Sequence, residues 1–459
     1  MDRIKTGIDN LDLIFGGGVP LYSVNVIAGT PGTGKTILLQ QMMFHNATPE
    51  TKGLYITTLS EPTVKVVRYQ QQFKFFAPEK VGKSVFFTDI GMTIRNEGLP
   101  KTIEVIVNFI KEIRPTFVVI DSFKAIHDLA PSTHGLREFV YDLAVKMAVW
   151  KCTTFLIGEY THQDLEKEPE FAVADGIIHL ENVSDSEQPM RYLKIVKMRG
   201  SNFLPGQHSY VISEEGIEIF PRQISMPETT ERGKEVLKTG MSGVDKLLGG
   251  GIPSQTVFLL AGTAGTGKTT FSLKYLYNGV TKYDEPGILF LYEESVEQII
   301  DIARGYGWDF VPLIKEGKIK IVYSSISDLN LDEHLLKIKK IVTETGAKRV
   351  VIDSLPSLLH QVSERPYLIT EKTSQLTSLL KGLGTTSVFI SRTPMGTSQV
   401  SKFGVEESLV DGIIILRIIE DKSKRKRSIE VYKLRNAKHV LGEHRMIISN
   451  EGLEVFYTG

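Results

Sequence analysis

GTPGTGKT (Gly29–Thr36) and GTAGTGKT (Gly262–Thr269) stand 233 positions apart in the chain and share one pattern, G-x-x-x-x-G-K-[ST]. Each follows an apolar run and opens a helical pattern, which is the context that a phosphate-binding loop requires. Its glycines let backbone N–H groups surround phosphate oxygens, and the helix N-terminus adds a positive dipole end. Two such matches in register argue against a glycine-rich turn that binds nothing, so the sequence predicts two phosphate-binding loops.

The residues of these loops have distinct expected roles in binding ATP with Mg²⁺. Lys35 and Lys268 are expected to reach the β- and γ-phosphates. The hydroxyl groups of Thr36 and Thr269 are expected to hold the metal ion. The expected nucleotide-binding residues are Gly29, Thr30, Gly32, Thr33, Gly34, Lys35 and Thr36 in the first loop, and Gly262, Thr263, Gly265, Thr266, Gly267, Lys268 and Thr269 in the second.

The loops belong to a longer internal repeat. Thr6–Pro20 and Thr239–Pro253 keep the same spacing and share seven of fifteen residues, and later markers stay in step. The chain is therefore a tandem duplication, because a period this long indicates repeated domains rather than a solenoid. The join falls in the polar, proline-containing stretch Pro221–Arg232. We expect units at 1–225 and 234–459, with a linker at 226–233.

Each unit alternates short β-rich runs with helical patterns. In the first, strands are expected at Val24–Ala28, Leu54–Thr58, Val85–Thr88, Phe117–Ile120 and Thr153–Gly158, with helices such as Thr36–Phe44 and Thr102–Ile113 between them. Apolar strands separated by helices predict a parallel sheet that is covered on both faces. The runs that follow, Gly176–Leu180, Arg191–Met198 and Tyr210–Ile212, predict an antiparallel extension of that sheet.

Composition excludes several classes of protein. The 459 residues contain 54 Lys and Arg and 54 Asp and Glu, a balance that argues against nucleic acid as a partner. The basic run Lys422–Ser428 is interpreted as a solvated hairpin turn, with attraction of an acidic partner as the alternative. The single cysteine, Cys152, excludes an intramolecular disulfide. The absence of an apolar signal or spanning segment favours a cytoplasmic protein with no membrane partner.

Asp121 and Asp353 end the apolar runs FVVI and VVI, downstream of the two loops. A carboxylate at the end of such a strand can orient Mg²⁺ and its water molecules. The alternative is an aspartate that caps the next turn. Thr36, Asp121, Thr269 and Asp353 are therefore the expected metal ligands.

Glu293 and Glu294 follow the second strand of unit two. A carboxylate here can polarise an attacking water molecule, and the alternative is a solvated acidic helix start. Unit one has Leu59 and Ser60 at the same place, with Glu61 one residue further on. Glu61 is the candidate catalytic residue of unit one, which we expect to bind ATP but to turn it over slowly.

These motifs together resemble the KaiC family of the RecA superfamily. The resemblance rests on the phosphate loops, the paired glutamates, the strand-end aspartates, a K-x-R ending and the opening TG-x₄-D-x₃-GGG-x-P, and it covers both units. It implies an α/β fold of two tandem RecA-like P-loop NTPase domains. It also implies a homohexameric ring with ATP at the subunit interfaces.

The resemblance assigns further residues. Lys197 and Arg199 in unit one, and Lys433 and Arg435 in unit two, match the K-x-R pair that a neighbouring subunit directs toward the γ-phosphate. From the residues alone, the alternative is two outward side chains on an edge strand. His439 matches a nucleotide-contacting position.

The clock members of this family phosphorylate a Ser/Thr pair in the second unit. Glu407 and Ser408 match that pair, so Ser408 is the candidate phosphosite, and an ordinary surface hydroxyl is the alternative. A KaiB-like or other signalling partner is implied. Unit two stops three residues after Phe456, so we expect no tail for a KaiA-like activator.

The resulting interpretation is a KaiC-like hexameric ATPase that acts as a nucleotide-controlled signalling ring, with unit two as the better catalyst and with Ser/Thr autokinase activity as an open extension. One alternative is a scaffold in which ATP in unit one only holds the ring together. Another is a RecA- or RadA-like DNA-dependent ATPase, which neutral charge and the lack of a separate DNA-binding domain disfavour.

Overall fold

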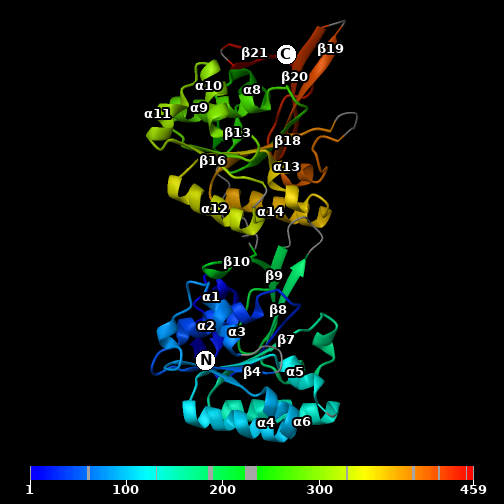
Figure 1. Ribbon diagram of the computed structural model, residues 1–459. Coiled ribbons are helices and arrows are strands. Elements are labelled where there is room, and N and C mark those ends of the chain that lie inside the picture. The colour runs from blue at the N-terminus through cyan, green and yellow to red at the C-terminus, as the bar shows by residue number, and fades with distance from the viewer. Residues whose placement is uncertain are drawn as a thin grey trace. The chain divides into compact units, whose positions relative to one another are not determined.

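The structure, a computed structural model, describes residues 2–58, 63–130, 132–183, 190–222, 235–326, 329–394, 399–421, 424–450 and 452–457. The chain forms two compact units, Met1–Arg222 and Gln223–Gly459 (Figure 1). The expected linker at 226–233 lies outside the described residues.

Unit one is built around a nine-stranded sheet in the order β11-β10-β9-β8-β3-β7-β6-β4-β5. The strands from β8 to β5 pair in parallel, and β9, β10 and β11 extend the sheet in antiparallel pairing. The strands are β3 (Val24–Gly29), β4 (Gly53–Thr57), β5 (Val85–Asp89), β6 (Phe117–Asp121), β7 (Thr153–Gly158), β8 (Gly176–Val183), β9 (Met190–Met198), β10 (Gln207–Ser213) and β11 (Gly216–Phe220), and a separate pair is β1 (Arg3–Ile4) with β2 (Val19–Pro20). The helices are α1 (Leu11–Ile14), α2 (Lys35–Asn46), α3 (Thr63–Gln70), α4 (Gly91–Ile113), α5 (Phe123–Asp128), α6 (Thr133–Val149) and α7 (Pro169–Val173).

Alternation along the parallel strands divides unit one between two cores. Val24 and Val26 of β3 pack in one core with residues of α4 and α6, whereas Ile27 packs in the other with residues of α1 and α2. Figure 1 shows α4 and α6 together on one side of the sheet and α2 on the other. Because both faces are covered, the strands are apolar along nearly their whole length.

Unit two repeats this architecture in the order β16-β15-β17-β18-β14-β19-β20-β21-β22. Its strands are β14 (Val257–Gly262), β15 (Gly287–Leu291), β16 (Ile319–Tyr323), β17 (Arg349–Asp353), β18 (Thr386–Arg392), β19 (Gly412–Asp421), β20 (Lys424–Leu434), β21 (His444–Ser449) and β22 (Gly452–Phe456), and the separate pair is β12 (Val236–Leu237) with β13 (Ile252–Pro253). Its helices are α8 (Ser242–Leu247), α9 (Lys268–Tyr283), α10 (Val296–Gly305), α11 (Phe310–Lys315), α12 (Leu331–Thr345), α13 (Leu355–Leu358), α14 (Pro366–Gly382) and α15 (Glu406–Leu409). None of the helices described in either unit is long and apolar enough to cross a bilayer.

The predicted α/β fold, two tandem RecA-like domains with mostly parallel sheets, is confirmed. One helix begins earlier than predicted: α4 starts at Gly91 rather than at Thr102. It joins two helical segments across a kink at Gly98, whose φ is +76°. Pro100 lies just after the kink, where a missing N–H removes no intrahelical hydrogen bond.

The basic run Lys422–Ser428 was interpreted wrongly as a turn. Residues 422 and 423 lie outside the described part of the chain, but β20 already begins at Lys424. It pairs with β19, and Arg425 lies directly opposite Glu420 with 3.5 Å between Nε and Oε1. Cross-strand pairs of opposite charge stabilise such a ribbon, so basic residues here extend the strand.

Arg349 at the start of β17 is fully buried in unit two. Its guanidinium donates to Glu285 Oε2 at 2.6 Å and to the carbonyl oxygens of Tyr275 and Lys238, both at 2.8 Å. It also lies 4.5 Å from the centre of the Tyr275 ring. Unit one has Phe117 at the equivalent position, where it stacks on Phe155, so only unit two depends on a buried charge here.

We expect Arg349→Met to lower the free energy of unfolding of unit two by about 3–5 kcal/mol, because it leaves the buried carbonyl groups without donors. The chain has two tryptophans, Trp150 and Trp308, and Trp308 lies in the core of unit two. Urea unfolding in a Trp150→Phe background, followed by Trp308 fluorescence, measures the loss. Arg304→Met is the control, since Arg304 is exposed and forms a surface ion pair with Asp301. Equal losses in the two variants would contradict the prediction.

Candidate nucleotide-binding sites

Both phosphate loops connect a central strand to a helix, β3 to α2 in unit one and β14 to α9 in unit two. Gly34 and Gly267 precede these helices with φ of +85° and +105°. A residue with a Cβ would be strained there, so glycine is required for the chain to turn from the strand into the helix. The helix N-terminus then faces the hollow of the loop, as an anion site needs.

The loop lysines fold back onto the loops that carry them. Lys35 Nζ donates to the carbonyl oxygens of Gly29 and Thr30, both at 2.9 Å. Lys268 makes the same two contacts in unit two at 2.8 Å. Burial lowers the pKa of both lysines, and nearby carboxylates oppose this effect. An incoming phosphate therefore replaces carbonyl oxygens as the partner of a partly desolvated ammonium group.

A cavity of about 610 Å³ lies at the loop of unit one. Asp121, at the end of β6, lines it and accepts hydrogen bonds from Thr36 Oγ1 at 2.9 Å and from the Tyr55 hydroxyl. Burial raises the pKa of Asp121, and the hydrogen bonds from Tyr55 and Thr36 and the charge of Lys35 oppose the rise. The two residues predicted as metal ligands in unit one are thus in direct contact.

A cavity of about 230 Å³ in unit two brings together Lys268, Thr269, Glu293, Glu294 and Asp353. Burial raises the pKa of Asp353 to about 7, and the negative charges of Glu294 and Glu293 add to the rise. Position three of β15 is a leucine, whereas the same position of β4 is the tyrosine that donates to the unit-one aspartate. The strand-end aspartate of unit two therefore lacks the hydrogen bond from a tyrosine that favours the ionised aspartate of unit one.

The two glutamates of unit two have different surroundings. Glu293 accepts a hydrogen bond from Ser357 Oγ. It also forms an ion pair with Arg392, whose Nη2 lies 2.5 Å from Glu293 Oε2. Glu294 Oε2 is buried and has no hydrogen-bond partner among the described residues. Glu293 is engaged by its neighbours, whereas Glu294 is the glutamate with an oxygen that none of the described residues holds.

The position directly after β7 in unit one carries a negative charge, whereas the equivalent position at the end of β18 in unit two carries a positive charge, and the sequence reasoning did not find this difference. Glu159, directly after β7, lines the cavity of unit one, and its charge opposes the lowering of the Lys35 pKa. Arg392 occupies the same position, the seventh from the start of the strand, in β18 of unit two. Extending the repeat alignment to this strand would have found the pair. The candidate Glu61 lies outside the described residues, and the described part of unit one offers Asp128 and Glu159 at the cavity besides Asp121.

The K-x-R residues of unit two do not line the cavity of their own unit. Lys433 Nζ donates to the carbonyl oxygens of Glu407 at 2.6 Å and Val410 at 2.9 Å. Arg435 Nη2 donates to the carbonyl oxygen of Ser408 at 2.8 Å, and the Arg435 side chain is exposed. Both side chains thus hold the short helix α15.

Unit one repeats this arrangement with α7. Lys197 Nζ lies 3.4 Å and 3.5 Å from the carbonyl oxygens of Phe171 and Ala172, and Arg199 Nη1 lies 3.3 Å from Asp175 Oδ1. β9 pairs with β10 only over Arg191–Lys194, so this end of β9 has a single neighbouring strand in the sheet.

Each K-x-R pair directly follows a β-bulge. The register shifts leave Val196 unpaired in β9 and Tyr432 unpaired in β20, and both side chains are exposed. A bulge adds twist and re-aims the side chains next to it. The sequence gives no periodic signal for this bulge, but it is present in both units.

The remaining predicted residues lie outside the cavities. His439 is half-buried in the loop between β20 and β21, and its Nε2 has no hydrogen-bond partner among the described residues. Ser408 is exposed, and its Oγ donates to the carbonyl oxygen of Val405 at 2.8 Å. Glu407 Oε1 accepts from the backbone N–H of Val400 at 3.2 Å and Ser401 at 2.9 Å, so its carboxylate anchors the preceding loop.

Comparisons with known proteins agree on one family. The family model described as the ATPase KaiC matches residues 4–224 and again 237–459. The circadian clock oscillator protein KaiC of Parathermosynechococcus lividus is 28% identical over 464 residues, which cover 98% of this chain and 85% of that protein. The circadian clock protein KaiC3 of a Synechocystis species is also 28% identical, over 475 residues that cover 99% of this chain and 92% of that protein.

The raised pKa of Asp353 predicts a pH dependence of stability in metal-free protein. Between the unfolded pKa of about 3.9 and the folded value of about 7, the folded state keeps a proton that the unfolded state releases. The free energy of unfolding should therefore fall as pH rises through this range, by up to about 1.4 kcal/mol per pH unit.

Urea unfolding in EDTA, followed by Trp308 fluorescence in the Trp150→Phe background, measures this slope. We expect a shallower slope for Asp353→Asn and an unchanged slope for the control Asp301→Asn, since Asp301 is exposed. A slope that Asp353→Asn leaves unaltered would refute the assignment.

Proposed function

Because the chain belongs to the KaiC family of ATPases, we propose that it forms a hexameric ring, binds Mg·ATP in both units and hydrolyses it chiefly in unit two. The observation that carries this proposal is the cavity of unit two, which Lys268, Thr269 and Asp353 line together with Glu294, the glutamate that has an unpartnered oxygen among the described residues.

The residues of this cavity divide the chemistry among them. The backbone N–H groups of the loop and Lys268 bind the phosphates. Thr269 and Asp353 offer hydroxyl and carboxylate oxygens, the ligands that Mg²⁺ prefers, and the ion supplies neutralising charge on the phosphate oxygens. Glu294 orients the attacking water molecule and accepts its proton, while Arg392 and Ser357 hold Glu293 beside it.

The positions of the K-x-R residues support a site completed by a second subunit. Lys433 and Arg435 lie outside the cavity of their own unit, next to α15. A guanidinium directed at the phosphates of an adjacent subunit can stabilise the charge that develops in the transition state. Lys197 and Arg199 are proposed to do the same in unit one, and His439 to contact the nucleotide of the neighbour.

Unit one is proposed to bind ATP and to hydrolyse it slowly. Its loop, Thr36 and Asp121 provide the phosphate and metal contacts. It has leucine and serine where unit two has its glutamate pair, so the carboxylates left to orient water are Glu61 and the cavity-lining Asp128 and Glu159. Long-lived ATP in unit one would favour an assembled ring.

We extend the proposal to autophosphorylation at Ser408, which would make the ring a nucleotide-controlled signalling protein. The support is that the Ser408 hydroxyl is exposed and lies next to the backbone that Lys433 and Arg435 contact. A partner would then recognise the ring in one nucleotide or phosphorylation state.

We expect Glu294→Gln to lower the ATPase kcat by about 10²–10⁴-fold, because it removes the proton acceptor while keeping the shape of the side chain. ATP binding and assembly should persist, as measured by nucleotide retention and light scattering. The matched control is Glu297→Gln, an exposed glutamate on α10 that does not line the cavity. Lys35→Ala should reduce turnover less than Lys268→Ala, and the opposite order would show that unit one carries the activity.

Incubation with Mg·ATP should place one phosphate on the peptide that contains Ser408, as measured by intact and peptide mass spectrometry. Ser408→Ala should remove this phosphate, and Glu294→Gln should slow its appearance. Accumulation of ADP with no phosphoprotein would reject autophosphorylation and leave the ATPase proposal standing.

A further inference from the structure

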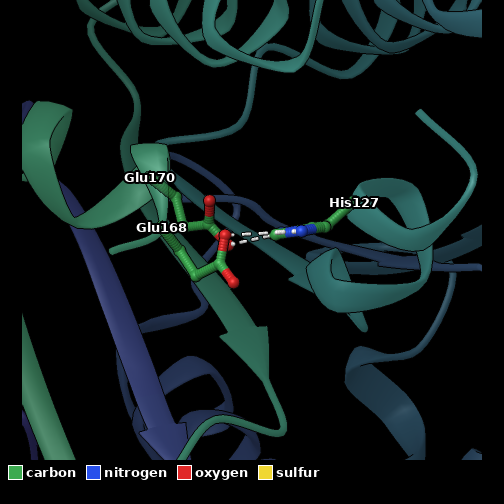
Figure 2. A group of neighbouring side chains, drawn as sticks. All are labelled: His127, Glu168 and Glu170. Atoms are coloured by element: carbon green, nitrogen blue, oxygen red, sulfur yellow. Dashed lines mark hydrogen bonds and ion pairs between the residues drawn. The ribbon is translucent and has the colours of Figure 1, made fainter. Parts of the chain in front are cut away.

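A histidine and two glutamates meet in unit one (Figure 2). His127 comes from α5, Glu170 from α7, and Glu168 is the residue directly before α7. The edge of the imidazole faces both carboxylates, with 3.2 Å from Nδ1 to Glu170 Oε1 and 3.4 Å from Nε2 to Glu168 Oε2. The three side chains can each offer one ligand atom, and these atoms lie within 4.8 Å of one another.

Glu170 is fully buried, and its carboxylate is only partly satisfied. Its Oε1 contacts His127 and accepts a hydrogen bond from the Tyr160 hydroxyl, but its Oε2 has no hydrogen-bond partner among the described residues. A buried, charged oxygen without a partner is costly. The cluster therefore lacks a positively charged or hydrogen-bonding group that would complete it.

Unit two shows how the same position is completed by protein alone. Glu406 is fully buried and, like Glu170, stands five residues before an Asp-Gly pair that begins the next strand. Its Oε2 accepts from Ser401 Oγ at 2.7 Å and from the Val405 N–H at 3.2 Å. Leu359 replaces the histidine, six residues after the strand-end aspartate. In unit two, a serine hydroxyl and a backbone N–H satisfy the buried carboxylate of Glu406. In unit one, the buried carboxylate of Glu170 instead has a histidine and a second carboxylate nearby.

The charges of the unit-one cluster favour a cation. Lys124 Nζ lies 3.9 Å from Glu168 Oε1 and 3.7 Å from Asp128 Oδ1, so it is shared between two carboxylates. With a neutral imidazole, the negative charge on Glu170 is left uncompensated in a buried place. Charges in such surroundings are normally paired or coordinate a metal ion.

We propose that His127, Glu168 and Glu170 bind a first-row divalent metal ion of the zinc type, distinct from the magnesium site at the phosphate loop. One imidazole nitrogen and carboxylate oxygens are a typical ligand set for Zn²⁺. A tetrahedral ion with bonds of about 2.0–2.2 Å holds its ligand atoms about 3.3–3.6 Å apart. The three ligand atoms lie within 4.8 Å of one another, and a rotation of the His127 ring that turns one nitrogen toward both carboxylates would bring them to that spacing. The Tyr160 hydroxyl would orient Glu170 from outside the ligand set.

The test is zinc binding to the full chain in the absence of nucleotide. Protein is freed of metal with EDTA, exchanged into buffer and titrated with ZnCl₂ by isothermal calorimetry. We expect one equivalent of zinc to bind with micromolar or tighter affinity. His127→Leu, which introduces the residue of unit two, should weaken this binding by at least about 100-fold. The control is His134→Leu, since His134 is exposed beside Glu138 on α6 and should not matter.

A second variant and a spectroscopic measurement separate the loss of zinc ligands from the loss of folding. Glu168→Gln preserves the size of a half-buried side chain, so it decides the outcome if His127→Leu does not fold by circular dichroism. Visible absorption of Co²⁺ in the same site should show d–d bands that both variants lose. Absence of zinc binding, or binding that both variants leave unchanged, would overturn the proposal and leave the cluster as a set of polar contacts that positions α5 against α7. Neither result depends on ATP turnover.

Discussion

Parallel pairing of the central strands is the constraint on which both nucleotide sites depend. In a parallel ladder the carboxyl ends of neighbouring strands lie at one edge of the sheet. The phosphate loop after β14, the glutamates after β15, Asp353 at the end of β17 and Arg392 at the end of β18 therefore meet at one place in unit two. Helices on both faces keep these strands buried and hold that edge in position.

The two units share one backbone arrangement but differ in the charged side chains around the phosphate loop. In unit one Tyr55 and Thr36 donate to Asp121, and a glutamate follows β7. In unit two Asp353 has two glutamates for neighbours, and an arginine ends β18. Exchanging a few side chains around the loop is enough to change the electrostatics of a site without altering the fold, because most of these residues lie at or just after strand ends and Tyr55 alone among them lies inside a strand.

The sequence was sufficient for the features that depend on local pattern. The phosphate loops, the strand-end aspartates and the mostly parallel sheet follow from glycine spacing and apolar runs, and the kink at Gly98 explains the one helix start that differed. Other features arise only from tertiary contacts. The different states of Glu293 and Glu294 depend on Arg392, which lies almost a hundred residues away, and the cluster around Glu170 combines residues from two separate helices. No sequence period or motif predicts contacts between residues so far apart in the chain, so these contacts become visible only in the folded structure.

The short helix α7 has a consequence for communication around an assembled ring. Its final carbonyl groups hold Lys197, its first turn carries Glu170, and His127 of α5 links that turn to the element that lines the nucleotide cavity. These contacts connect the element that lines the cavity to Lys197, the side chain that is proposed to reach a neighbouring subunit. Thermodynamic linkage then requires reciprocity, because whatever nucleotide binding does to the position of α7, the position of α7 does to the affinity for nucleotide.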